Sequence, residues 1–288
     1  MDHRTAHIRT PDGLTLFTRH WLPFGEPAAH VVLAHGIHEH SGRYAYPAGQ
    51  LLRRGLAVHA LDHRGHGQSE GARGTVERFD DFVDDLRHFV LEVREAHPDA
   101  PLFLMGHSMG GLMAASCVAR HGAAPLAGLV LSSPALRVEV PWLLRTLAPV
   151  VARWLPAAPA KRIDLSRLSH DPRVARQFRE DEHAIRRGVG ARLGYEVTQA
   201  AARLDARSEA FALPLYVFHG TADAITDPEG SRAFVDAAPS PDKTLRLYDG
   251  LYHETLNEYE RDTVIGELAD WLVARAEAAR GDRAEGAA

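Results

Sequence analysis

Short apolar runs alternate with amphipathic segments along most of the chain. The runs 30–34, 56–61, 101–105, 126–131, 215–219 and 244–248 each have the length of a buried strand. Between the first three runs, residues 46–54 and 80–96 have the apolar spacing of helices, and a final helix is expected over about 259–274. This alternation predicts a doubly wound, mostly parallel sheet with helices on both faces.

One long segment interrupts the alternation. Its first part, 141–155, is apolar on most sides and contains Pro149, which should kink or divide a helix, whereas 171–204 is more polar and amphipathic. We therefore expect an α/β core at 1–135 and 213–276 with a helical lid inserted at 136–212, over the carboxyl ends of the strands. Residues 277–288 are small and charged, so we expect them to be a frayed, disordered tail.

The composition narrows the class of protein. The 288 residues are 45% hydrophobic and 25% charged, as in ordinary globular proteins, and the net charge of -5 gives no reason to expect nucleic acid as a partner. We find neither an apolar signal-peptide core nor about 18 uninterrupted apolar residues, so we expect a cytoplasmic protein. The single cysteine, Cys117, excludes an internal disulfide and should be a small buried hydrophobe.

A serine between glycines is the first sign of chemistry. Residues 106–110 read Gly-His-Ser-Met-Gly, which has the form G-x-S-x-G at the junction of an expected strand and an expected helix. A sharp turn of this kind needs glycines where a Cβ would meet neighbouring backbone. The pattern predicts that Ser108 is a nucleophile exposed at the start of a helix.

A serine nucleophile needs a base, and the base needs a carboxylate. Asp223 follows the strand that ends near residue 219, and His253 follows the strand that ends near residue 248. The chain order Ser108, Asp223, His253 is the order expected for these three roles on such a sheet. We therefore predict that Ser108, Asp223 and His253 are the catalytic residues.

Three rival carboxylates suit structural roles better. Asp62 lies upstream of the serine in a glycine-containing loop, where we expect it to stabilise the loop through hydrogen bonds. Asp227 precedes a proline and should cap a helix, and Asp249 falls short of the loop that carries His253.

Acyl transfer also needs two donors for the developing oxyanion. The backbone N–H of Met109, after the nucleophile, and that of Ile37, in the loop after an early strand, are predicted to form this oxyanion hole.

No cofactor or metal is expected. The segment Gly65-x-Gly67-x-x-x-Gly71 has one residue too many for a dinucleotide fingerprint, and Asn257 stands where a zinc-protease helix would carry its second histidine. The histidines at 35, 38 and 40, and at 63 and 66, lack a matching carboxylate or cysteine set.

Several segments together resemble one family. They are 35–44 (His-Gly-Ile-His-Glu-His-Ser-Gly-Arg-Tyr), 62–71 (Asp-His-Arg-Gly-His-Gly-Gln-Ser-Glu-Gly), 106–111, 219–223 (His-Gly-Thr-Ala-Asp), 253–254 and 257–258. The chain resembles the monoacylglycerol lipase and lysophospholipase group of serine α/β-hydrolases over nearly its whole length except the lid. The resemblance implies the α/β-hydrolase fold, the same triad of Ser108, Asp223 and His253, and oxyanion donors at Ile37 and Met109.

The resemblance also suggests how a substrate would bind. In that family an apolar lid admits the acyl chain and lies against membranes. Such a surface could be formed here by Trp142, Leu143, Leu144, Leu147, Val150, Val151, Trp154 and Leu155. These side chains could equally pack on other lid helices or on a partner subunit. Glu39 and Arg43 would lie near the glycerol end of the site, or they form an ion pair that braces their loop. The chain departs from the animal enzymes in the lid and at Leu256, which replaces a polar histidine.

The sequence thus predicts a serine esterase that cleaves single-chain lipid esters, foremost monoacylglycerol to glycerol and fatty acid, through an acyl-serine intermediate. One alternative is a lysophospholipase or a general short-chain carboxylesterase. A second, of another class, is an inactive α/β-hydrolase fold that serves as a binding module. The complete set of Ser108, Asp223, His253 and two oxyanion donors argues against the binding module.

Overall fold

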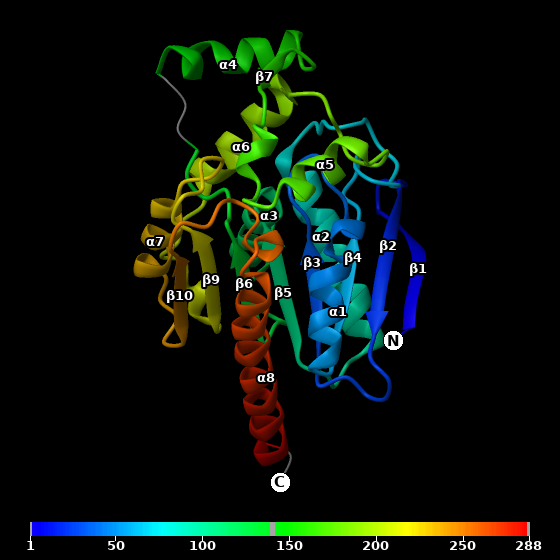
Figure 1. The fold of residues 1–288 in the computed structure, drawn as a ribbon. Coiled ribbons are helices and arrows are strands. Elements are labelled where there is room, and N and C mark those ends of the chain that lie inside the picture. Colours follow the sequence, from blue (N-terminus) through cyan, green and yellow to red (C-terminus); the bar gives the residue numbers. More distant parts are fainter. Residues whose placement is uncertain (1, 139–141, 287–288) are drawn as a thin grey trace.

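The computed structural model describes residues 2–138 and 142–286, without the side chains of 142–145, 161 and 282–286. A mixed eight-stranded sheet in the order β1-β2-β4-β3-β5-β6-β9-β10 lies at its centre (Figure 1). Its strands are β1 Asp2–Arg9, β2 Thr15–Leu22, β3 Ala29–Ala34, β4 Leu56–Leu61, β5 Leu102–His107, β6 Gly128–Ser132, β9 Leu215–Gly220 and β10 Lys243–Tyr248. The six strands from β4 to β10 in that order pair in parallel, as the sequence predicts.

Helices cover both faces of the sheet. Every residue of β3, β4, β5, β6 and β9 is buried, which explains why these strands read as continuous apolar runs. One face packs against α2, α3 and α7, and the other against α1 and α8. The bounds are α1 Ala45–Arg53, α2 Phe79–Ala96, α3 Met109–His121, α7 Pro228–Ala237 and α8 Arg261–Gly286.

The segment between β6 and β9 forms a layer at one end of the sheet and contributes side chains to the same buried core (Figure 1). Its elements are α4 Trp142–Trp154, β7 Pro159–Lys161, the 3-10 helix η2 Leu165–Arg167, α5 Pro172–Glu180, β8 Val189–Gly190, α6 Ala191–Arg203 and the 3-10 helix η3 Glu209–Ala212. Strands β7 and β8 pair with each other, and α4 packs on α6. The layer interrupts the alternation where the lid insertion was expected.

The structure differs from the sequence-based expectation at both ends of the chain. Strands β1 and β2 form an antiparallel hairpin that was not predicted. The expected tail from residue 277 instead continues α8 to Gly286, because its Ala, Glu and Arg residues favour helix and Ala276 is buried. Arg280 also donates to the carbonyl of Pro27 at 2.8 Å. Of the kink or division expected at Pro149, the division does not occur, because α4 continues through this residue.

Candidate active site

Ser108 lies in a strained turn between β5 and α3. Its φ of 55° is in the left-handed region, and the helix begins at the next residue. A Cβ at Gly106 would lie 2.2 Å from the carbonyl oxygen of Gly110, and one at Gly110 would lie 2.2 Å from that of Ala34. Both glycines are therefore required by close backbone approach, as the G-x-S-x-G interpretation supposes.

Asp223 and His253 meet although 30 residues separate them. Asp223 follows β9, His253 follows β10, and Nδ1 of His253 lies 2.7 Å from Oδ2 of Asp223. Both side chains are almost fully buried. Because Asp223 holds Nδ1, the imidazole presents Nε2 as its basic nitrogen.

The Asp223 carboxylate accepts several further hydrogen bonds. The N–H groups of Ile225 and Thr226 donate to Oδ1 at 2.7 and 3.1 Å, and the Thr226 hydroxyl lies 2.8 Å from Oδ2. A second imidazole, that of His219 at the end of β9, lies 2.9 Å from the same Oδ2. Sequence reasoning did not identify His219 as part of the site.

The pKa of Asp223 reflects these contacts. Burial alone would raise it, but the positive charge of His253 and the hydrogen bonds from His219 and His253 outweigh burial and hold the pKa well below its usual range. Asp223 is therefore ionised at neutral pH.

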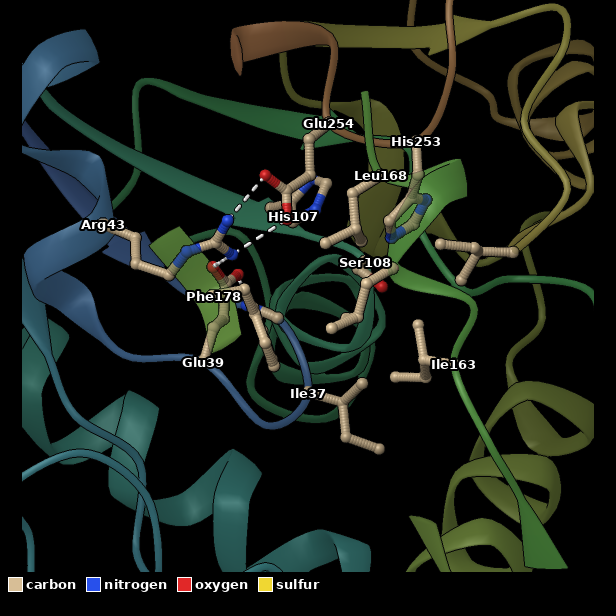
Figure 2. A pocket seen from close by; sticks show the side chains of 13 residues that line it. Ile37, Glu39, Arg43, His107, Ser108, Ile163, Leu168, Phe178, His253 and Glu254 are labelled. Carbon is tan, nitrogen blue, oxygen red and sulfur yellow. Dashed lines mark hydrogen bonds and ion pairs between the residues drawn. The ribbon is translucent and has the colours of Figure 1, made fainter. Parts of the chain in front are cut away.

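Ser108 and His253 line one cavity together with Ile37 (Figure 2). The hydrogen bonds of the described residues do not include one between the Ser108 hydroxyl and His253; such contacts often tighten only when substrate binds. Outside the regular elements, the backbone hydrogen bonds of the described chain include none donated by Ile37 or Met109. Both N–H groups thus remain available to an oxyanion.

Glu39 braces the loop that carries the Ile37 N–H. Its Oε1 accepts from the backbone N–H of Gly36 at 2.5 Å and from the Tyr44 hydroxyl at 2.7 Å. Its Oε2 accepts from Nη1 of Arg43 at 2.7 Å. This contact is the loop-bracing ion pair, one of the two roles that the sequence leaves open for Glu39 and Arg43. The other is a position near the glycerol end of the site.

Arg43 has a second carboxylate partner from the far end of the chain. Its Nη1 and Nη2 each lie 2.8 Å from an oxygen of Glu254, the residue after His253. The side chains of Glu39, Arg43 and Glu254 all line the cavity (Figure 2). Burial would raise the pKa of Glu254, but the Arg43 charge overrides it and lowers that pKa to about 2. Burial and the nearby Glu254 charge raise the pKa of Glu39, against the opposing effect of Arg43. Arg43 therefore offers no unpaired positive charge to a ligand.

Apolar side chains from the segment between β6 and β9 cover this cavity. They are Ile163, Leu165, Leu168 and Phe178. The carbonyl of Leu168 accepts from the N–H of Glu254 at 2.7 Å, so the covering segment is tied to the loop of His253. The cavity measures about 30 Å³, which is room for about two water molecules.

The outer helix α4 carries exposed apolar side chains. Leu147, Val150 and Trp154 of α4, together with Leu155 directly after it, are 53–74% exposed. The side chains of Trp142, Leu143 and Leu144, assigned to the same surface from the sequence, lie outside the described residues. None of the described helices combines the length and the apolar character needed to cross a bilayer.

Other residues singled out from the sequence have structural roles. Asp62 accepts from the N–H and hydroxyl of Ser41 at 2.8 and 2.6 Å and from the N–H of Gln68, which confirms its role in the loop. Asp227 caps α7 as predicted, and Cys117 is buried.

One group of histidines remote from Ser108 has the spacing of potential metal ligands. It consists of His30, His59 and His97 within the described residues. However, Nδ1 of His30 lies 2.8 Å from Nε2 of His59, which is a hydrogen-bond distance and shorter than the roughly 3.4 Å that separates two nitrogens bound to one zinc ion. Burial lowers the pKa of His30 to about 4, and the charges of His97, Arg94 and Arg280 add to this effect. We interpret His30 and His59 as hydrogen-bonded neutral imidazoles, with the ring of His97 stacked on that of His30.

Comparison with known proteins agrees with this geometry. Residues 25–260 match the model of the family described as serine aminopeptidase, S33 (Hydrolase_4). The chain is 36% identical over 255 residues to the monoacylglycerol lipase of Mycolicibacterium smegmatis, covering 88% of this chain and 91% of that protein. It is also 36% identical over 279 residues to the monoglyceride lipase of Mus musculus, covering 95% and 91%.

The structural comparison gives the same result. The crystal structure of Paleococcus ferrophilus monoacylglycerol lipase superposes with a TM-score of 0.77 at 30% identity, over 96% of this chain and 100% of that one. The α/β-hydrolase fold and the family predicted from the sequence are thereby confirmed.

Proposed function

Because the chain belongs to the serine aminopeptidase S33 (Hydrolase_4) family of α/β-hydrolases, we propose that it is an esterase that hydrolyses monoacylglycerol to glycerol and a fatty acid. One observation carries the proposal. Ser108 and the Asp223-held His253 open onto a single cavity whose cover is made of apolar side chains. Such a site combines a nucleophile and its base with a lining suited to an acyl chain.

The proposed reaction proceeds through an acyl enzyme. His253 Nε2 takes the proton of the Ser108 hydroxyl while Oγ attacks the ester carbonyl, and the N–H groups of Ile37 and Met109 stabilise the oxyanion. His253 then gives this proton to the departing glycerol oxygen as the carbonyl reforms. Water repeats the sequence on the acyl enzyme, with His253 as base, and releases the fatty acid and free Ser108.

The charge around Arg43 favours a neutral head group over a phosphate. Among the described residues that line the cavity, Arg43 carries the one guanidinium, and two carboxylates surround it. A phosphate entering there would find no unpaired guanidinium and would face the charges of Glu39 and Glu254. Glycerol hydroxyls carry no charge and can bond to the same groups. We therefore place monoacylglycerol before lysophospholipids, and keep Glu39 and Arg43 as candidate head-group contacts.

The lid completes the proposal. The acyl chain would enter past Leu168 and Phe178, while the exposed apolar residues of α4 would rest transiently on a lipid surface. The proposed location is the cytoplasm, with peripheral contact to membranes. No cofactor or metal takes part in the proposed reaction.

A substrate panel tests the proposal. Purified protein is assayed with 1-acylglycerol, with a lysophospholipid of equal chain length and with a short-chain p-nitrophenyl ester, each with and without lipid vesicles. We expect the highest kcat/KM for 1-acylglycerol and a gain in rate on vesicles. A preference for the lysophospholipid would favour that alternative, cleavage of only the short ester would favour a general carboxylesterase, and inactivity on all three would favour the binding module.

A further inference from the structure

A second histidine contacts the carboxylate of Asp223. The side chain of His219 is fully buried, and its Nε2 lies 2.9 Å from Oδ2 of Asp223, the oxygen that also holds His253 at 2.7 Å. The reaction derived above needs only one imidazole on this carboxylate. The role of the second one is therefore open.

The contacts of His219 define its protonation state. An ionised carboxylate only accepts hydrogen bonds, so Nε2 of His219 must carry the hydrogen that it shares with Asp223. On the other side of the ring, Nδ1 lies 2.8 Å from the hydroxyl of Ser231, a buried residue of α7. Among the described residues that hydroxyl has no other hydrogen-bond partner, so it donates to Nδ1. A ring that donates through Nε2 and accepts at Nδ1 is neutral.

A neutral donor suits the carboxylate of a catalytic pair. A charged His219 would cancel the negative charge that has to stabilise the His253 imidazolium during the reaction. A neutral His219 leaves that charge intact and still fixes the carboxylate by one more hydrogen bond. Without it, the partners of Oδ2 among the described residues would be only His253 and the Thr226 hydroxyl. That hydroxyl also lies 3.1 Å from the carbonyl of Ser133 and can donate to it instead.

We propose that His219 is a positioning residue for Asp223, a role that rests on the proposed hydrolase mechanism. Its neutral Nε2–H fixes Oδ2 opposite His253 and keeps the carboxylate ionised, so that the proton shared by Asp223 and His253 remains on the imidazole. Ser231 acts one step further out by setting the tautomer of His219.

Two substitutions of similar polarity separate positioning from mere packing. In His219→Gln the side-chain amide nitrogen reaches about as far as Nε2 and can still donate to Asp223. In His219→Asn the shorter amide ends near the place of Nδ1, on the side of Ser231. With a short-chain p-nitrophenyl ester we expect kcat to fall about 10- to 100-fold in His219→Asn, as for the loss of one hydrogen bond to a charged group. His219→Gln should stay within about threefold of wild type, and KM should change little in either variant.

The pH profile provides a readout that a purely structural role would not move. Among the described residues, the titratable groups around His253 are His219 near the end of β9, Asp223 after β9, His107 at the end of β5, and Glu254 in its own loop, with Arg43 bonded to Glu254. Only His219 changes in the variants. When its donor is lost, the charge of Asp223 concentrates on His253, which then keeps its proton to higher pH. The acid limb of kcat/KM in His219→Asn should therefore move up by about 0.5–1 pH unit, and that of His219→Gln should not move.

The outcomes decide the proposal. Wild-type kcat and an unmoved acid limb in His219→Asn would overturn it, and so would an equal loss in both variants. The tautomer is measured independently, on wild-type protein, from the ring ¹⁵N chemical shifts of histidine, with His219→Gln used to assign the resonance. A neutral Nε2–H ring at neutral pH supports the proposal, whereas a doubly protonated or Nδ1–H ring overturns it even if His219→Asn does not fold. Wild type that cleaves the short ester but not 1-acylglycerol would refute the proposed substrate and leave this comparison intact.

Discussion

The ion pair between Arg43 and Glu254 leads to a prediction about head-group charge. Glu254 binds both terminal nitrogens of Arg43 at 2.8 Å, and Glu39 binds one of them at 2.7 Å. The substitution Glu254→Gln removes one negative charge from the cavity lining, while Glu39 still pairs with the guanidinium. At a separation of roughly 8 Å and an effective dielectric constant of about 20, one unit charge changes the energy of a bound phosphate by ~2 kcal/mol, or about 30-fold.

The assay compares two substrates in the same protein preparation. The ratio of kcat/KM for a 1-acylglycerol phosphodiester, whose phosphate carries one negative charge, to that for the 1-acylglycerol of equal chain length should rise about 30-fold in Glu254→Gln. The ratio is insensitive to the fraction of folded protein, which matters because breaking a buried pair also costs about 3–5 kcal/mol of stability. Glu77→Gln, at a side chain 91% exposed, is the matched control. A ratio that stays within about threefold of wild type would refute the electrostatic reasoning.

Three further predictions concern the turn, the buried histidines and the lid. Gly110→Ala should abolish activity and lower the free energy of unfolding, because its Cβ would lie 2.2 Å from a carbonyl oxygen. Gly266→Ala, whose Cβ would meet open space in α8, should raise the free energy of unfolding by about 0.5–1 kcal/mol. Equal urea midpoints for the two variants would contradict this. Because burial lowers the pKa of His30 to about 4, the unfolded chain binds more protons than the folded chain between pH 6.5 and about 4. The contribution of His30 to stability is therefore full above pH 6.5 and falls as the pH decreases through this window. Between pH 7.5 and pH 4.5, the free energy of unfolding measured in urea should therefore fall by up to about 3 kcal/mol less in His30→Leu than in wild type. An equal fall in the two proteins would speak against the assignment. Trp154→Ser should reduce sedimentation with vesicles and turnover of vesicle-bound 1-acylglycerol, but not turnover of a soluble short ester. Phe24→Ser, at an exposed aromatic outside the lid, should leave sedimentation and turnover unchanged. Equal effects of the two substitutions would argue against docking through α4.

The parts of the site that were predictable follow from local geometry and strand direction. The turn at Ser108 is encoded within five residues, because its glycines are required by backbone contacts only a few residues away along the chain or across the sheet. The meeting of Asp223 and His253 follows from β9 and β10 being parallel neighbours, whose carboxyl ends lie at one edge of the sheet. Such features need no knowledge of side-chain packing.

The parts that were missed depend on long-range contacts or lack a periodic signal. The ion pair of Arg43 and Glu254 joins residues 211 positions apart, and no local pattern encodes it. The proposed role of His219 depends on its contact with the hydroxyl of Ser231, which lies in α7. Strand β1 is polar and mostly exposed, so it shows no alternation of apolar and polar positions that could have revealed the hairpin.

The proposed mechanism requires that Ser108 forms the covalent intermediate. The direct measurement is the site of modification by an alkyl fluorophosphonate, read by peptide mass spectrometry on wild type and on Ser108→Ala, together with turnover of 1-acylglycerol by both. We expect a single adduct on Ser108, none on the variant, and a loss of turnover on the order of 10⁶-fold. An adduct elsewhere, or near-wild-type turnover by Ser108→Ala, would contradict it.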